Sequence, residues 1–66
     1  MDAKARMQIV NDIFADISEK LGRLTTQGVI TVKEGVDLIN TISKKQYEWM
    51  INNFTPDEID NFIRNI

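Results

Sequence analysis

Residues 3–24 read AKARMQIVNDIFADISEKLGRL, with an apolar side chain at alternating steps of four and three residues. This spacing keeps one side of an α-helix apolar along its length, which is typical of helices that pack against another helix. The segment therefore predicts a long helix with an apolar seam, made by Ala3, Met7, Val10, Phe14, Ile17, Leu21 and Leu24.

A glycine and a capping box mark the joint that follows. We expect the first helix to cover residues 3–27, since Gly28 can adopt the left-handed conformation that closes a helix. The spacing of Thr31 and Glu34 is that of a capping box and predicts a second helix over residues 32–53. A joint this short makes the two helices an antiparallel hairpin.

The second helix has two apolar stripes and two weak points. Gly35 and the polar residues 43–46 are places where a break or kink would occur, so its continuity is left open. Winding the segment at about 100° per residue directs one stripe toward the seam of the first helix. That stripe consists of Val32, Val36, Ile39, Tyr47, Met50 and Phe54.

Residues 55–58, Thr-Pro-Asp-Glu, combine an N-cap, a proline at the first helical position and a second capping box. They predict a third helix over residues 56–65, which we expect to fold back over Trp49 with Phe62 and Ile63. Its apolar residues lie on one face and must dock on something: Ile59, Phe62, Ile63 and Ile66.

The sequence thus predicts an all-α fold in one domain, residues 1–66: an antiparallel helical hairpin with a short third C-terminal helix. A chain of 66 residues builds a core near the lower limit for independent folding. The chain has no Cys and no His, which excludes disulfides and thiolate or imidazole metal sites. Association with further chains is the remaining source of stability, so we expect oligomerisation to complete the fold.

Composition argues against several functional classes. A formal net charge of −2 and the lack of a basic stripe argue against nucleic-acid binding, and no apolar run matches a membrane span. The carboxylates fall at helix ends and on polar faces, and no glycine-rich phosphate loop is present. We therefore expect no catalysis, no cofactor and no metal, and a cytoplasmic location.

The apolar residues outside the two facing stripes are the candidate partner-binding or oligomer interface. A lone hairpin buries one face of each helix, so a second stripe needs another cover. Trp49 is the only Trp, and the sequence leaves open whether it belongs to the core or to the interface. The candidate interface residues are Ile9, Ile13, Leu38, Ile42 and Trp49.

One local pattern resembles a known family. The match covers residues 21–34, and Gly35 departs from it. The pattern resembles the short C-terminal (SHOCT) domains, small helical hairpins associated with oligomerisation and protein contacts. In size and helical economy the chain also resembles phage-encoded accessory or inhibitor proteins, which implies a host-cytoplasmic location. The residues that carry the SHOCT resemblance are Leu21, Leu24, Gly28, Ile30, Thr31 and Glu34.

These observations favour a protein–protein interaction module, an adaptor or inhibitor that occupies the surface of a partner protein and acts as a homo-oligomer. The alternative is an oligomer that sequesters a small anionic ligand, such as a nucleotide, between subunits, using basic side chains and helix N-termini. A structural assembly protein is the third hypothesis.

Overall fold

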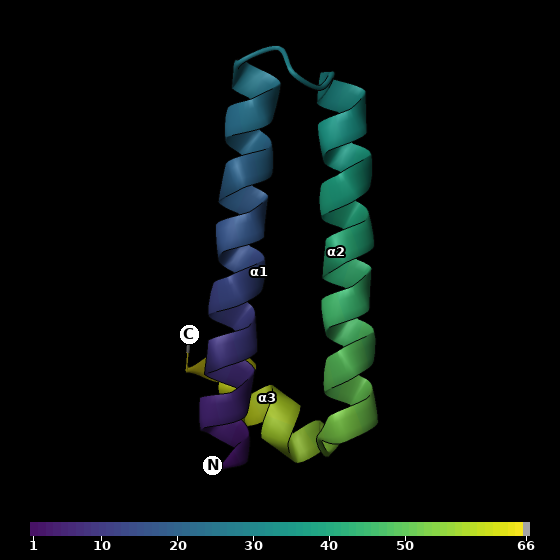
Figure 1. Ribbon diagram of the computed structural model, residues 1–66. Helices are drawn as coiled ribbons and strands as arrows, with labels where there is room; N and C mark the ends of the chain where they lie inside the picture. Colours follow the sequence, from purple (N-terminus) through teal and green to yellow (C-terminus); the bar gives the residue numbers. More distant parts are fainter. Residues whose placement is uncertain (66) are drawn as a thin grey trace.

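The computed structural model describes residues 1–65 and contains three helices, α1 (Ala3–Thr26), α2 (Val32–Asn53) and α3 (Pro56–Arg64). Helices α1 and α2 form an antiparallel hairpin, and α3 crosses its open end from the foot of α2 to α1 (Figure 1). The molecule is elongated, with extents of 40 × 18 × 16 Å. The predicted all-α hairpin with a third helix is confirmed, while the expected role of Ile66 lies outside the described residues.

The helix starts are fixed by local hydrogen bonds. Asp2 caps α1, because its carboxylate accepts a 2.7 Å hydrogen bond from the backbone N–H of Ala5. Both predicted capping boxes are present, at the starts of α2 and α3. In the first box the backbone N–H of Thr31 donates to the Glu34 carboxylate, and the Thr31 hydroxyl accepts from the backbone N–H of Glu34. Hydrogen bonding from Thr31 favours the ionised carboxylate, so the pKa of Glu34 lies below its ordinary value.

The turn between α1 and α2 is built around Gly28, whose φ of 76° is the left-handed conformation expected from the sequence. The backbone N–H of Val29 donates to the carbonyl of Leu24, and that of Gly28 to the carbonyl of Thr25. This pair of bonds is a Schellman motif. It ends α1 at Thr26 and reverses the chain within a few residues.

Helix α2 is continuous through residues 43–46, and it faces α1 with a different stripe from the expected one. Gln46 Nε2 donates a 3.1 Å hydrogen bond to Asn11 Oδ1 of α1. Three turns away, Gly35 is buried against α1, where an added Cβ would lie 2.6 Å from Thr25 Oγ1. Gly35 and Gln46 therefore mark the side of α2 that contacts α1, and the half-buried Ile39 and Ile42 lie between them on that stripe.

The prediction that Val32, Val36 and Tyr47 face α1 is wrong. Their exposed fractions are 70%, 50% and 60%. The expected stripe contained apolar residues alone. The observed contact includes Gly35, which lets the two backbones approach, and the Gln46–Asn11 amide pair, which bonds across the helices. Met50 and Phe54, from the same predicted stripe, are buried at the foot of α2, where α3 covers them.

The core lies at the open end of the hairpin, where the three helices meet. Ala3, Trp49 and Ile59 pack against its rim. The expectation that Ile63 covers Trp49 is wrong, since 55% of the Ile63 surface is exposed. Among the described residues, the buried hydrophobic side chains are Met7, Met50, Phe54 and Phe62.

Candidate functional site

The candidate interface residues gather on one face of the hairpin. Ile9, Ile13 and Ile17 follow one another at steps of four along α1, and all three are exposed. Leu38 is exposed on α2, and Ile42 is half-buried one turn below it. We call the exposed side chains of this surface, Ile9, Ile13, Ile17 and Leu38, the hairpin face, and Ile42 lies at its edge on the stripe that contacts α1.

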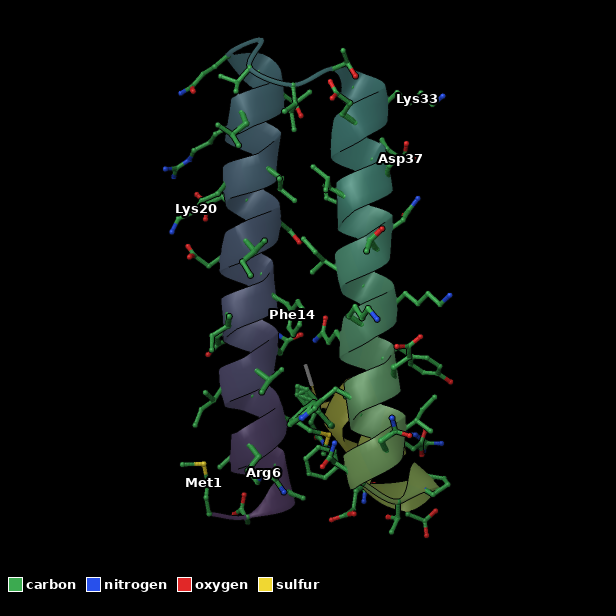
Figure 2. The ribbon with its side chains drawn as sticks, turned by 45° about the vertical axis from the view of Figure 1, so that its right-hand side comes forward. Met1, Arg6, Phe14, Lys20, Lys33 and Asp37 are labelled. Atoms are coloured by element: carbon green, nitrogen blue, oxygen red, sulfur yellow. The ribbon has the colours of Figure 1, made fainter. Side chains whose placement is uncertain are left out.

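Helical geometry places the hairpin face opposite α3. Phe14 of α1 points between the two long helices (Figure 2). At about 100° per residue, Ile13 lies about 100° from Phe14 around the axis of α1, and Leu38 lies about 40° from Ile42 around the axis of α2. Both rotations are counted toward the N-terminus of the helix. In an antiparallel pair, rotations in this same direction lead to the same side of the hairpin. Met50, which belongs to the core with α3, lies about 80° from Ile42 in the opposite sense.

Trp49 joins the core to the foot of this face. It is half-buried, and its ring meets Phe54 in a T-shaped contact with centroids 5.1 Å apart. The guanidinium of Arg6 lies 5.9 Å from the Trp49 ring centroid and 5.1 Å from that of Phe54, within range of a cation–π interaction. Trp49 is therefore held by α1 and by the end of α2, and its role as an interface residue stays a prediction.

A second apolar surface lies between α2 and α3, and the sequence analysis did not identify it. A groove of about 340 Å³ has Phe54 and Ile59 among its lining residues, and Tyr47, Ile51 and Ile63 also line it although each is more than half exposed. We call this the α2–α3 groove. The sequence had suggested that Tyr47 faces α1 and that Ile63 covers Trp49, so neither residue pointed to a groove. Ile51 was the one exposed lining residue with no assigned role, and it was the only sequence signal for this surface.

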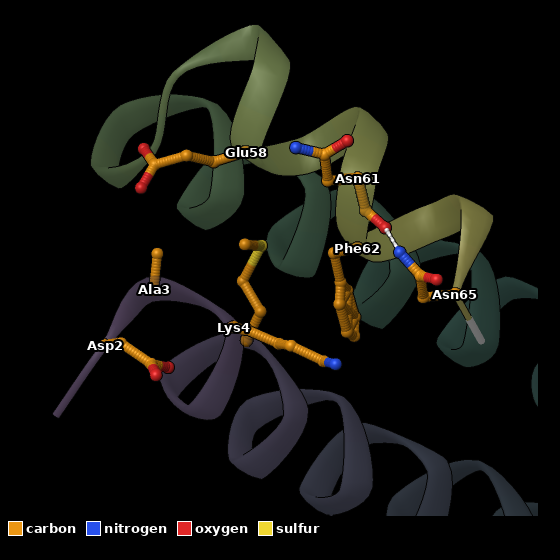
Figure 3. A pocket seen from close by; sticks show the side chains of 8 residues that line it. Asp2, Ala3, Lys4, Glu58, Asn61, Phe62 and Asn65 are labelled. Carbon is orange, nitrogen blue, oxygen red and sulfur yellow. Dashed lines mark hydrogen bonds between the residues drawn. The ribbon is translucent and has the colours of Figure 1, made fainter.

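A second hollow, of about 390 Å³, lies between the start of α1 and α3, and polar side chains line much of it (Figure 3). Asp2 and Glu58 line it, but each already accepts a backbone N–H as a cap. Lys4 is its one basic side chain beside these two acids. This balance does not favour an anion, and the carboxylates are committed to helix starts.

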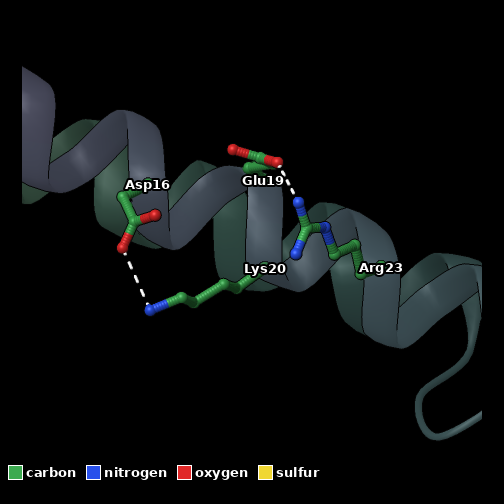
Figure 4. Close-up of polar contacts among 4 residues, drawn as sticks. All are labelled: Asp16, Glu19, Lys20 and Arg23. Carbon is green, nitrogen blue, oxygen red and sulfur yellow. Dashed lines mark hydrogen bonds and ion pairs between the residues drawn. The ribbon is translucent and has the colours of Figure 1, made fainter.

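Several charged side chains of the long helices are paired within their own helix. Lys20 lies 3.1 Å from Asp16, and Arg23 bonds to Glu19, each pair on consecutive turns of α1 (Figure 4). Within residues 1–65, no three His, Cys, Asp or Glu side chains gather as metal ligands would. None of the described helices combines the length and apolar character needed to cross a membrane.

The comparisons with known proteins found no match. No protein-family model matches the chain, and no curated protein and no solved structure matches it.

Proposed function

We propose that this protein is a non-catalytic helical interaction module, an adaptor or inhibitor that occupies the surface of a partner protein and acts as a homo-oligomer. The proposal rests on how few apolar side chains are buried, compared with how many are exposed, among the residues that the structure describes. Four hydrophobic residues are buried, whereas eleven large ones are exposed. Extended apolar surface of this kind marks protein contacts in folded proteins.

The α2–α3 groove is the surface that takes the partner protein. Its exposed Tyr47, Ile51 and Ile63 surround a concave apolar floor, which suits inserted apolar side chains. Asp60 is the one acid among its lining residues, and its carboxylate lies 3.0 Å from Nε of Arg64 on the same helix. The matching partner segment is therefore an apolar stretch whose side chains insert into the groove.

A quantitative pull-down with two matched variants tests this function. The tagged chain, Ile51→Lys and Val29→Lys are compared in lysate of the source cells. Ile51 lies in the groove, and Val29 is an exposed residue in the turn, outside both apolar surfaces. We expect one protein captured by the wild type and by Val29→Lys and lost with Ile51→Lys.

Direct titration of the captured protein, purified, then measures the interaction. A Kd raised tenfold or more by Ile51→Lys, about 1.4 kcal/mol, is the expected result. Equal capture by all three chains, or no captured protein that titrates, would overturn the proposal.

A further inference from the structure

The chain exposes more surface than its mass requires. Its accessible surface is 4984 Å² for 7.6 kDa. A compact monomer of this mass exposes roughly 4,300 Å², so the excess is about 700 Å². Each partner in a stable protein interface buries about 800 Å². The excess reflects the elongated shape of the hairpin and is similar in size to the area that one chain contributes to a stable dimer.

The hairpin face is where this surface is uncovered. The long helices of the hairpin are covered by α3 at one end and on one side, the side of Met50 and Phe54. The opposite side carries Ile9, Ile13 and Leu38 with nothing packed over them. A flat apolar face on two antiparallel helices fits the same face of a second hairpin, because four helices then share one core.

Charge favours a second copy on this face. Residues 1–27 hold four acids and four bases, and residues 28–54 hold three of each, so both long helices are neutral. Near the face, Asp16 pairs with Lys20 on α1 (Figure 4), and Lys45 pairs with Glu48 on α2. Paired charges of this kind do not add a net charge that would repel a second copy. Residues 55–66, with three acids and one base, carry the net −2 of the chain.

We propose that a second copy of this chain covers the hairpin face and closes a two-fold symmetric four-helix core. Ile9, Ile13, Ile17 and Leu38 of both chains are buried in it. The α2–α3 groove stays outside the contact on both chains and remains open to another protein. The proposal rests on the homo-oligomer named under the proposed function and adds the face, the symmetry and the occupant.

Two matched lysine substitutions test the assignment by sedimentation equilibrium between about 1 and 100 μM, a range that brackets ordinary micromolar affinities. Ile13→Lys places a charge at the centre of the hairpin face, and Ile51→Lys places the same charge in the α2–α3 groove. The two isoleucines are 54% and 51% exposed, so neither change disturbs the isolated chain. We expect the wild type and Ile51→Lys to have the mass of two chains and Ile13→Lys to have that of one, with a Kd raised tenfold or more.

Circular dichroism and the pull-down separate the remaining outcomes. Ile13→Lys should keep its helical signal and still capture the partner protein, since the groove is intact. If it loses helicity, Leu38→Lys applies the same test from α2. A wild type with the mass of one chain throughout overturns the proposal. So does a dimer that Ile51→Lys dissociates and Ile13→Lys does not, although in that case the proposed oligomer itself survives.

Discussion

The two ends of the hairpin are held together in different ways. At the foot, α3 closes over the ends of both long helices, and Met7, Met50, Phe54 and Phe62 are buried together. Toward the turn only two helices are present, and the buried residue there is Gly35. Two helices alone cannot enclose a large side chain, because each touches only one neighbour.

This difference shows what each element contributes. Burial of large apolar side chains in this chain depends on a third helix, short as α3 is. Toward the turn, contact depends on close approach, with Gly35 against Thr25 and the half-buried Leu21, Leu24 and Ile39 on either side. The fold is thus stabilised by hydrophobic burial at the foot and by close packing of α1 against α2 at the turn end. Substitutions at each end should separate these two contributions.

The largest effect is expected at the foot, from Phe62→Ala. Phe62 is 5% exposed, and truncating a buried Phe costs about 3–5 kcal/mol. This is a large part of the stability of a small domain, so the variant should be mostly unfolded or close to it. The neighbouring Ile63→Ala is the control, and we expect a change within about 0.5 kcal/mol because Ile63 is exposed.

Urea denaturation followed by circular dichroism measures this difference at one fixed protein concentration. Trp49 fluorescence adds a local signal, because Trp49 packs against the cluster that contains Phe62. Its emission should shift to the red in Phe62→Ala. Equal costs for Phe62→Ala and Ile63→Ala would contradict the placement of the core at the foot.

The turn end is tested by its glycines. In Gly35→Ala the new Cβ would meet Thr25 Oγ1 at 2.6 Å, and that hydroxyl is held by a 3.0 Å bond to the carbonyl of Leu21. Overpacking of this kind costs about 1–3 kcal/mol, and the helix propensity of Ala offsets about 1 kcal/mol of it. We expect a net loss of about 1 kcal/mol, recovered in the double variant with Thr25→Ala.

Gly22→Ala is the matched control in α1. Nothing lies within 4 Å of the Cβ that it adds, so the propensity term acts alone and the variant should gain about 1 kcal/mol. Thermal melts of the three variants give the comparison. A stabilising Gly35→Ala would mean that α1 and α2 do not approach closely at this point.

A similar effect is expected midway between the two ends, from the Asn11–Gln46 hydrogen bond. Gln46→Ala leaves a half-buried amide without its partner and should cost about 1 kcal/mol. Gln8→Ala removes a comparable 2.8 Å bond to Asp12 on the exposed surface of α1, where we expect almost no change. A double-mutant cycle between Asn11 and Gln46 isolates the pair, and a coupling of zero would show that it adds nothing.

The smallest effect is the acid dependence of the cap on α2. The pKa of the Glu34 carboxyl is lower in the folded chain than in the unfolded one, since the bonds to Thr31 favour the ionised form. Its contribution is therefore present above the unfolded pKa, about 4.5, and is lost as the pH falls through the folded value. Glu34→Gln keeps a capping acceptor without titrating. The gap between the melting temperatures of wild type and variant should narrow below about pH 4, and a gap independent of pH would contradict this.

Much of the local structure could be predicted because its causes are local. The two capping boxes, the proline that follows Thr55 and the left-handed Gly28 act within a few residues, so the predicted bounds of α2 are those observed. The seam of α1 was also identified, although Ile17 is exposed at its edge. The exposed part of the candidate site, Ile9, Ile13 and Leu38, followed from apolar residues left over once each helix had one face assigned.

The α2–α3 groove could not be found in this way. Its walls come from two helices whose relative placement depends on which side of the hairpin α3 takes. Both sides offered apolar residues, so the pattern allowed α3 to cover Trp49 with Ile63. In the structure Phe62 enters the cluster with Met50, and Ile63 is left on the rim of the groove.

The sequence by itself thus determined where the helices begin and end, that the first two form a hairpin, and which residues of α1 face a neighbour. Hydrogen bonds within a turn and the helical repeat decide these features, and both are written in short stretches of chain. Tertiary structure alone decided which stripe of α2 meets α1 and where α3 lies. Those choices depend on how closely two backbones approach at Gly35 and on which side chains fill the space between three helices, and no single helix contains that information.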